Sequence, residues 1–168
     1  GVTALALTDG RPIAPGDVVQ SAGGMGIVAG ERITATLQFD GGVTANLLQH
    51  RLPKADNAAY GLEVLGHEGR LFWKSGGAWW LPTPHFVPAT GESPWQPLES
   101  PVPDSYDPAS KAQVDDYAFV DDYVNALDEG REPQCSGAEA THVLEIMMGI
   151  FESAAYGRPV DLPQTRRD

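Results

Sequence analysis

Two helices are the clearest prediction of the hydrophobic pattern, and both lie in the last third of the chain. Ser136 followed by Glu139 has the spacing of a capping box, in which each side chain binds the backbone amide of the other residue. A helix should therefore begin near Gly137. Gly157 suits the left-handed position that follows a helix and Pro159 cannot continue one, so this helix should end just before them.

Apolar residues cover so much of this helix that we expect most of it to be buried. They recur at three- and four-residue spacing and extend beyond a single stripe: Ala140, Val143, Leu144, Ile146, Met147, Met148, Ile150, Phe151 and Ala154. The preceding helix, roughly Lys111 to Glu129, has one stripe that should pack while its acidic side meets water: Tyr117, Val120, Tyr123, Val124 and Leu127. Gly130 and Pro133 leave a short connection, so the two helices should form an antiparallel hairpin.

The first eighty residues alternate between apolar and polar positions, which is the period of a β-strand. A strand from Glu31 to Phe39, a turn at Asp40-Gly41-Gly42 and a return from Val43 to His50 predict one hairpin. A second hairpin should turn at Gly66 to Gly69. The strands of this second hairpin should cover Tyr60 to Leu65 and Arg70 to Trp73. Two further strands should cover Val2 to Leu7 and Ala78 to Leu81.

Eight of the fourteen prolines lie between Pro82 and Pro108. Proline cannot donate to a sheet ladder, so we interpret this segment as a long surface excursion with an edge strand at His85 to Val87. The order of strands, excursion and helices predicts an α+β fold, in which an open and mostly antiparallel sheet carries a helical layer on one face. We expect one domain over residues 1–168, with strands in 1–81, the excursion in 82–110, helices in 111–157 and a closing tail in 158–168.

The net charge of −12 and the pI near 4.5 argue against nucleic-acid binding, which draws on clustered basic residues. Nine acidic residues and only one base, Lys111, lie between Glu99 and Glu129, and we interpret them as a solvated face, with an acidic docking surface as the alternative. The single cysteine, Cys135, excludes an internal disulfide. No apolar run is long enough for a membrane span. We expect a cytoplasmic protein, while a targeting signal upstream of Gly1 stays open.

No residue of the chain is a strong candidate for cofactor binding, metal binding or catalysis. Gly24 to Ala29 matches the G-x-G-x-x-A turn of dinucleotide-binding folds, but a strand rather than a helix should follow it, so we interpret it as a glycine loop. His142 and Glu145 share a helical face, yet a pair without a third ligand is a weak metal signal.

Two pairs of residues are candidates for binding. His50 and Arg51 end a predicted strand, where they could grip an anionic or hydroxylated substrate if the strand end faces a cleft. Trp79 and Trp80 should point to opposite faces of the sheet, so one of them must lie outside the helix-covered core. We expect this pair at an oligomer interface, and a stacking platform for a sugar ring is the alternative.

Three stretches of the chain share a pattern with a known family. They read ITATLQFDGGVTANLLQHR, YGLEVLGHEGRLFW and VDDYVNALDEGREPQCSGAEATHVLEIMMGIFESAAYGRPVDLP. Together they resemble the C-terminal domain of the Gfo/Idh/MocA oxidoreductases, the family of glucose-fructose oxidoreductase and inositol dehydrogenase. The resemblance covers most of the chain from Gly30 onward, matches Pro82 to Pro108 poorly, and implies a dihydrodipicolinate-reductase-like C-terminal fold.

The resemblance implies that full-length members join this sheet domain to a Rossmann domain that binds NAD or NADP. It also implies a sugar, polyol or related hydroxyl compound as substrate, and a homodimer or larger homo-oligomer through the open sheet face. The family's Glu-Lys-Pro and Asp-x-Gly-x-His-x-x-Asp motifs do not occur in residues 1–168, so we expect a catalytically incomplete fragment. The alternative is a non-catalytic oligomerisation or carbohydrate-binding module.

Overall fold

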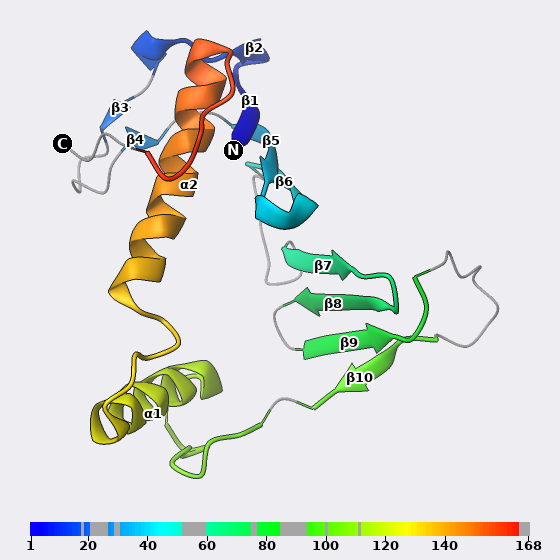
Figure 1. Cartoon of the computed structure of the whole chain (residues 1–168), viewed down its shortest axis with the longest axis vertical. Helices are drawn as coiled ribbons and strands as arrows, with labels where there is room; N and C mark the ends of the chain where they lie inside the picture. The colour runs from blue at the N-terminus through cyan, green and yellow to red at the C-terminus, as the bar shows by residue number, and fades with distance from the viewer. Residues whose placement is uncertain are drawn as a thin grey trace. The chain divides into compact units, whose positions relative to one another are not determined.

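The computed structural model describes residues 1–17, 19–20, 27–28, 31–51, 60–74, 77–84, 94–99, 101–110 and 112–164. The chain divides into two compact units, one of residues 1–51 and 132–168 and the other of residues 52–131. Among the described residues, each unit holds one α-helix and one four-stranded antiparallel sheet, and the first unit also holds a two-stranded sheet (Figure 1). The predicted α+β class with open antiparallel sheets is confirmed, whereas the single domain over residues 1–168 stays a prediction.

The sheet of the first unit has the strand order β2-β1-β5-β6. Its strands are β1 (Val2–Thr8), β2 (Arg11–Pro12), β5 (Arg32–Gln38) and β6 (Thr44–His50). The predicted hairpin of β5 and β6 is confirmed, and the 3₁₀ turn Asp40–Gly42 joins its strands. Gly41 and Gly42 have φ angles of 82° and 84°, which explains why the turn needs glycine. A second 3₁₀ turn covers Pro15–Asp17.

A small hairpin of β3 (Val19–Gln20) and β4 (Ile27–Val28) lies between β2 and β5 in the sequence. Ile27 and Val28 belong to the G-x-G-x-x-A match, and they form a strand rather than the start of a helix. The other residues of that match lie outside the described part of the chain. The interpretation of the motif as a glycine loop stays a prediction.

Helix α2 (Gly137–Tyr156) lies along β1 and closes the core of the first unit (Figure 1). The buried core combines residues of β1 and β5, the residue after β2, one face of α2 and the tail: Val2, Ala6, Ile13, Ile33, Ala35, Ile150, Ala154 and Val160. Ser153 is the buried polar residue of this helix, and its hydroxyl accepts a hydrogen bond of 3.0 Å from the backbone N–H of Ala4. The helix is thereby fixed to the strand by both packing and a hydrogen bond.

Both ends of α2 agree with the prediction. Glu139 N–H donates to the Ser136 hydroxyl at 3.2 Å, and Ser136 N–H donates to the Glu139 carboxylate at 3.4 Å. Gly157 takes the left-handed conformation with φ 63°. The expectation that the helix is mostly buried is confirmed within its own unit only from Gly149 onward, since the preceding apolar residues, such as Val143 and Met147, are not covered by that unit. Hydrophobic spacing shows that a surface is apolar but does not show whether another element reaches it.

The sheet of the second unit has the strand order β10-β9-β8-β7. Its strands are β7 (Gly61–Leu65), β8 (Arg70–Lys74), β9 (Gly77–Leu81) and β10 (Gln96–Leu98). The predicted second hairpin and the strand before Pro82 are confirmed. The expected edge strand at His85 to Val87 lies outside the described residues. Strand β10 was not predicted, and it holds Pro97 at the edge of the sheet, where a missing N–H is tolerated.

Helix α1 (Val114–Glu129) belongs to the second unit. The segment before α1 packs against the start of the helix, because the rings of Tyr106 and Tyr117 meet edge to face with their centroids 5.3 Å apart. The rest of the predicted packing stripe is exposed within its own unit, as at Val120 and Leu127, so the packing of this stripe stays a prediction. The helical hairpin of α1 and α2 stays a prediction, since the two helices lie in different units.

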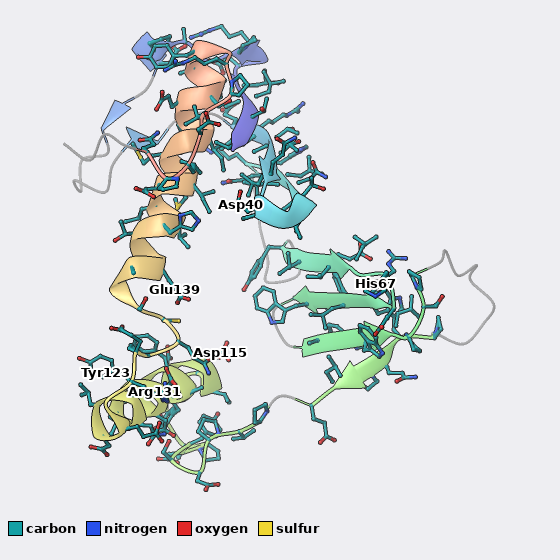
Figure 2. All side chains as sticks on the ribbon, in the orientation of Figure 1. Asp40, His67, Asp115, Tyr123, Arg131 and Glu139 are labelled. Carbon is teal, nitrogen blue, oxygen red and sulfur yellow. The ribbon has the colours of Figure 1, made fainter. Side chains whose placement is uncertain are left out.

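Arg131 closes the C-terminal end of α1 (Figure 2). Its guanidinium donates to Glu129 at 2.7 Å and to Asp122 at 2.8 Å, and these two carboxylates raise the pKa of Arg131. A cation at this position also compensates the negative end of the helix dipole. Among the described residues, neither helix is long and apolar enough to cross a membrane.

Candidate functional site

The two faces of the second sheet differ in chemistry. Directly opposite pairs in β8 and β9 include Phe72 with Trp79 and Leu71 with Trp80. Because successive strand residues point to opposite faces, Trp79 and Trp80 lie on different faces, as the alternation predicted. We call the face that holds Trp80 the apolar face and the face that holds Trp79 the hollow face.

The apolar face is formed almost entirely by aliphatic and aromatic side chains, several of them exposed. Leu62, Val64, Trp73 and Leu98 are between 42% and 56% exposed. The ring of Tyr60 lies 5.9 Å from that of Trp73. Contiguous exposed apolar surface of this kind is typical of an association surface.

The hollow face contains a depression of about 420 Å³, lined by Phe72, Lys74, Trp79 and Trp95. The ring planes of Phe72 and Trp79 differ by 30° with centroids 6.0 Å apart. Trp95 stands at 64° to Phe72, at 6.3 Å. Two rings, tilted by 30° to each other, therefore form the floor and the third forms a wall.

Two cationic side chains border this aromatic hollow. The Arg70 guanidinium lies 5.7 Å from the Trp95 ring, and it also pairs with Glu63, to which its Nε donates at 2.9 Å. The Lys74 ammonium lies 5.4 Å from the centre of the Trp79 ring. No carboxylate of the described residues pairs with Lys74, so its charge is available to a ligand.

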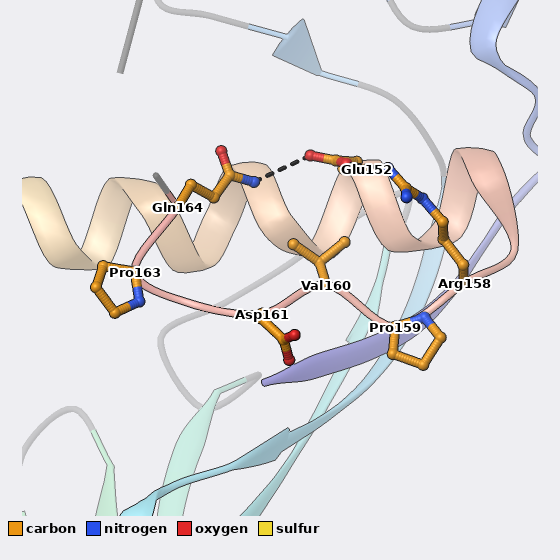
Figure 3. Close-up of a pocket in the computed structure, with 7 residues that line it drawn as sticks. All are labelled: Glu152, Arg158, Pro159, Val160, Asp161, Pro163 and Gln164. Atoms are coloured by element: carbon orange, nitrogen blue, oxygen red, sulfur yellow. Dashed lines mark hydrogen bonds and ion pairs between the residues drawn. The ribbon is translucent and has the colours of Figure 1, made fainter. Parts of the chain in front are cut away.

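A larger hollow, of about 530 Å³, lies in the first unit beside the closing tail (Figure 3). Three of its polar side chains bind one another: Arg158 and Gln164 each donate to the Glu152 carboxylate at 2.9 Å. Val160 in the same tail exchanges two backbone hydrogen bonds with Val2, of 2.8 and 2.9 Å. These contacts fasten the tail to α2 and β1, which gives the hollow a structural role.

His50 and Arg51 do not converge. His50 lies opposite Arg32 in the ladder, and strand alternation sends the side chain of Arg51 to the other face. Arg51 continues the ladder through its N–H, which donates to the Glu31 carbonyl at 2.7 Å, and its guanidinium lies 3.9 Å from the Glu31 carboxylate. Both residues are exposed. Their role in substrate binding stays a prediction.

Phe72, Lys74 and Trp95 were not predicted from the sequence as partners of Trp79. The signal was present for two of them, because residues 72 and 74 share a face in an alternating strand that pairs with Trp79. Trp95 could not be placed, since it lies in the proline-rich excursion and reaches the sheet only through β10. The described residues contain no group of three or more His, Cys, Asp or Glu side chains that could hold a metal.

One comparison with known proteins gives a family for the chain. The model of the oxidoreductase family C-terminal alpha/beta domain, of the Gfo/Idh/MocA type, matches residues 15–162. No curated protein and no solved structure matches the chain significantly. The matched span includes β5 and β6 of the first sheet, the whole second sheet, both helices and the beginning of the closing tail, whereas β1 and β2 precede it. The chain thus belongs to the Gfo/Idh/MocA oxidoreductase family and contains its C-terminal domain.

Proposed function

We propose that this chain is the substrate-binding and oligomerisation domain of an NAD(P)-dependent oxidoreductase that acts on a sugar, a polyol or a related hydroxyl compound. The family match over residues 15–162 carries the proposal. The two faces of the second sheet support a division of labour, because one is apolar and the other holds an aromatic hollow beside a cation. Residues 1–168 lack both of the family's proton-transfer motifs, so the hydride-transfer machinery belongs to another part of the enzyme.

The reading frame that encodes the chain tests this proposal. We expect an upstream strand followed by G-x-G-x-x-G and, further on, a Glu-Lys-Pro triplet. An unrelated upstream domain or a stop codon would instead favour a self-sufficient oligomerisation or carbohydrate-binding module. The exposed aromatic hollow is the observation that favours this second candidate.

We further propose that the apolar face pairs with a second copy of the chain to form a homodimer or a larger homo-oligomer. Only one of Trp79 and Trp80 can lie in a single such interface, and Trp80 is the one on the apolar face. Two leucines of β7 offer a matched test. Leu62 is 56% exposed on the apolar face, and Leu65 is 68% exposed on the hollow face.

Replacing Leu62 by Asp should therefore shift the chain towards monomer, because an interface would have to bury an unpaired carboxylate. Leu65→Asp makes the same chemical change on the same strand and should leave the mass unchanged. Light scattering at high micromolar concentration measures both variants. A monomeric wild-type chain, or equal masses for the two variants, would count against association through the apolar face.

A further inference from the structure

We infer that the aromatic hollow binds a carboxylated sugar, with the ring stacked on Phe72 and Trp79 and the carboxylate paired with Lys74. The inference deepens the proposed substrate-side function, on which it rests, by assigning the ligand class and the residues that select it. It starts from the shape of the hollow. A floor of two rings that differ by 30° accepts a flat apolar face, and the wall formed by Trp95 limits its lateral position.

The size of the hollow suits one sugar ring. Its volume of about 420 Å³ lies in the lower range of small-molecule sites. A pyranose has C–H groups on its faces and hydroxyl groups on its rim, so its face can pack on aromatic carbon while its rim stays in water. The hydroxyl groups on the rim of the sugar thus stay hydrated and need no buried hydrogen-bond partners.

The charge of the hollow selects an acidic sugar over a neutral one. Arg70 is already neutralised by Glu63, whereas Lys74 has only the Trp79 ring as a partner among the described residues. A half-buried ammonium beside aromatic carbon is less well hydrated than one in water, which favours pairing with a ligand carboxylate. The chain carries a net charge of −12, so this attraction must come from Lys74 itself rather than from the overall field.

The four tryptophans make the site directly testable by NMR, because their indole N–H signals report on both faces of the sheet. The wild-type chain is titrated with D-glucuronate and with D-glucose. We expect the Trp79 and Trp95 signals to shift, while those of Trp73 and Trp80 on or near the apolar face stay in place. Glucuronate should bind about fivefold more tightly than glucose, because a partly exposed ion pair contributes a free energy that corresponds to a ratio of about this size.

Lys74→Met should reduce glucuronate affinity about fivefold, to that of glucose, and should leave glucose binding unchanged. Lys74→Arg should keep the preference for the acid. Arg158→Gln removes an equal charge from the other unit and should change neither affinity, which excludes an effect of net charge. These variants concern a half-exposed or exposed side chain and should fold normally.

Three results would overturn the inference: equal affinities for the two sugars, an equal effect of Lys74→Met on both, or shifts confined to Trp73 and Trp80. Failure of glucuronate to bind at millimolar concentration would overturn it as well. In each case the light-scattering comparison of the Leu62 and Leu65 variants still reports on the proposed domain role. The two proposals can therefore fail separately.

Discussion

Gly69→Ala is expected to destabilise the second sheet by about 3 kcal/mol, a strong case of overpacking. Gly69 is buried at the end of the turn between β7 and β8. A Cβ there would overlap the ring of Trp80 and lie 2.6 Å from the carbonyl oxygen of Leu81. The carbonyl is backbone of the paired strand β9, so it cannot move without disturbing the ladder between Arg70 and Leu81.

Gly66→Ala is the matched control in the same turn. Its Cβ would meet only the Gly69 carbonyl oxygen at 3.4 Å, an ordinary contact. We expect a change within about 0.5 kcal/mol for this variant. Urea denaturation followed by tryptophan fluorescence measures both, since all four tryptophans lie in or next to the affected sheet. Equal stabilities of the two variants would show that Trp80 does not lie against Gly69.

Ile150→Ala should destabilise the first unit by about 3 kcal/mol, the usual effect of truncating a buried isoleucine. Ile150 is 5% exposed and belongs to the core between α2 and the sheet. Val143 lies on the same helix but is 54% exposed, so Val143→Ala should change the stability by no more than about 0.5 kcal/mol. Circular dichroism of the helix during urea denaturation measures the difference.

The Ile150 comparison also tests which part of α2 packs on the sheet, because Val143 and Ile150 lie two turns apart on the same face of the helix. A large loss for Val143→Ala together with a small loss for Ile150→Ala would mean that the N-terminal half of the helix, rather than its C-terminal half, is packed on the sheet. The structure requires a large loss of stability for Ile150→Ala and a small one for Val143→Ala.

The sequence predicted those elements whose signals are local. The ends of α2 followed from a capping box and a left-handed glycine, and the hairpin of β5 and β6 followed from alternation and the two glycines of its turn. Such features depend on residues that are close in the chain. They can therefore be interpreted without knowing what lies across the core.

Features that depend on distant partners could not be predicted in the same way. The exposed first half of α2 has the same apolar spacing as its buried second half, and only the extent of the sheet distinguishes them. Strand β10 was missed because Pro97 counted against a strand, although an edge position removes that objection. The hollow depends on β10, since β10 brings Trp95 against Phe72.

We propose that this chain supplies the substrate side and the association surface of an oxidoreductase but no site for the dinucleotide. Calorimetric titration of the chain with NADH and with NADPH is the decisive experiment. We expect no saturable heat with either dinucleotide, because residues 27 and 28 of the glycine motif form a strand and no dinucleotide-binding repeat occurs in the sequence. Saturable binding at micromolar concentration of either dinucleotide would contradict it.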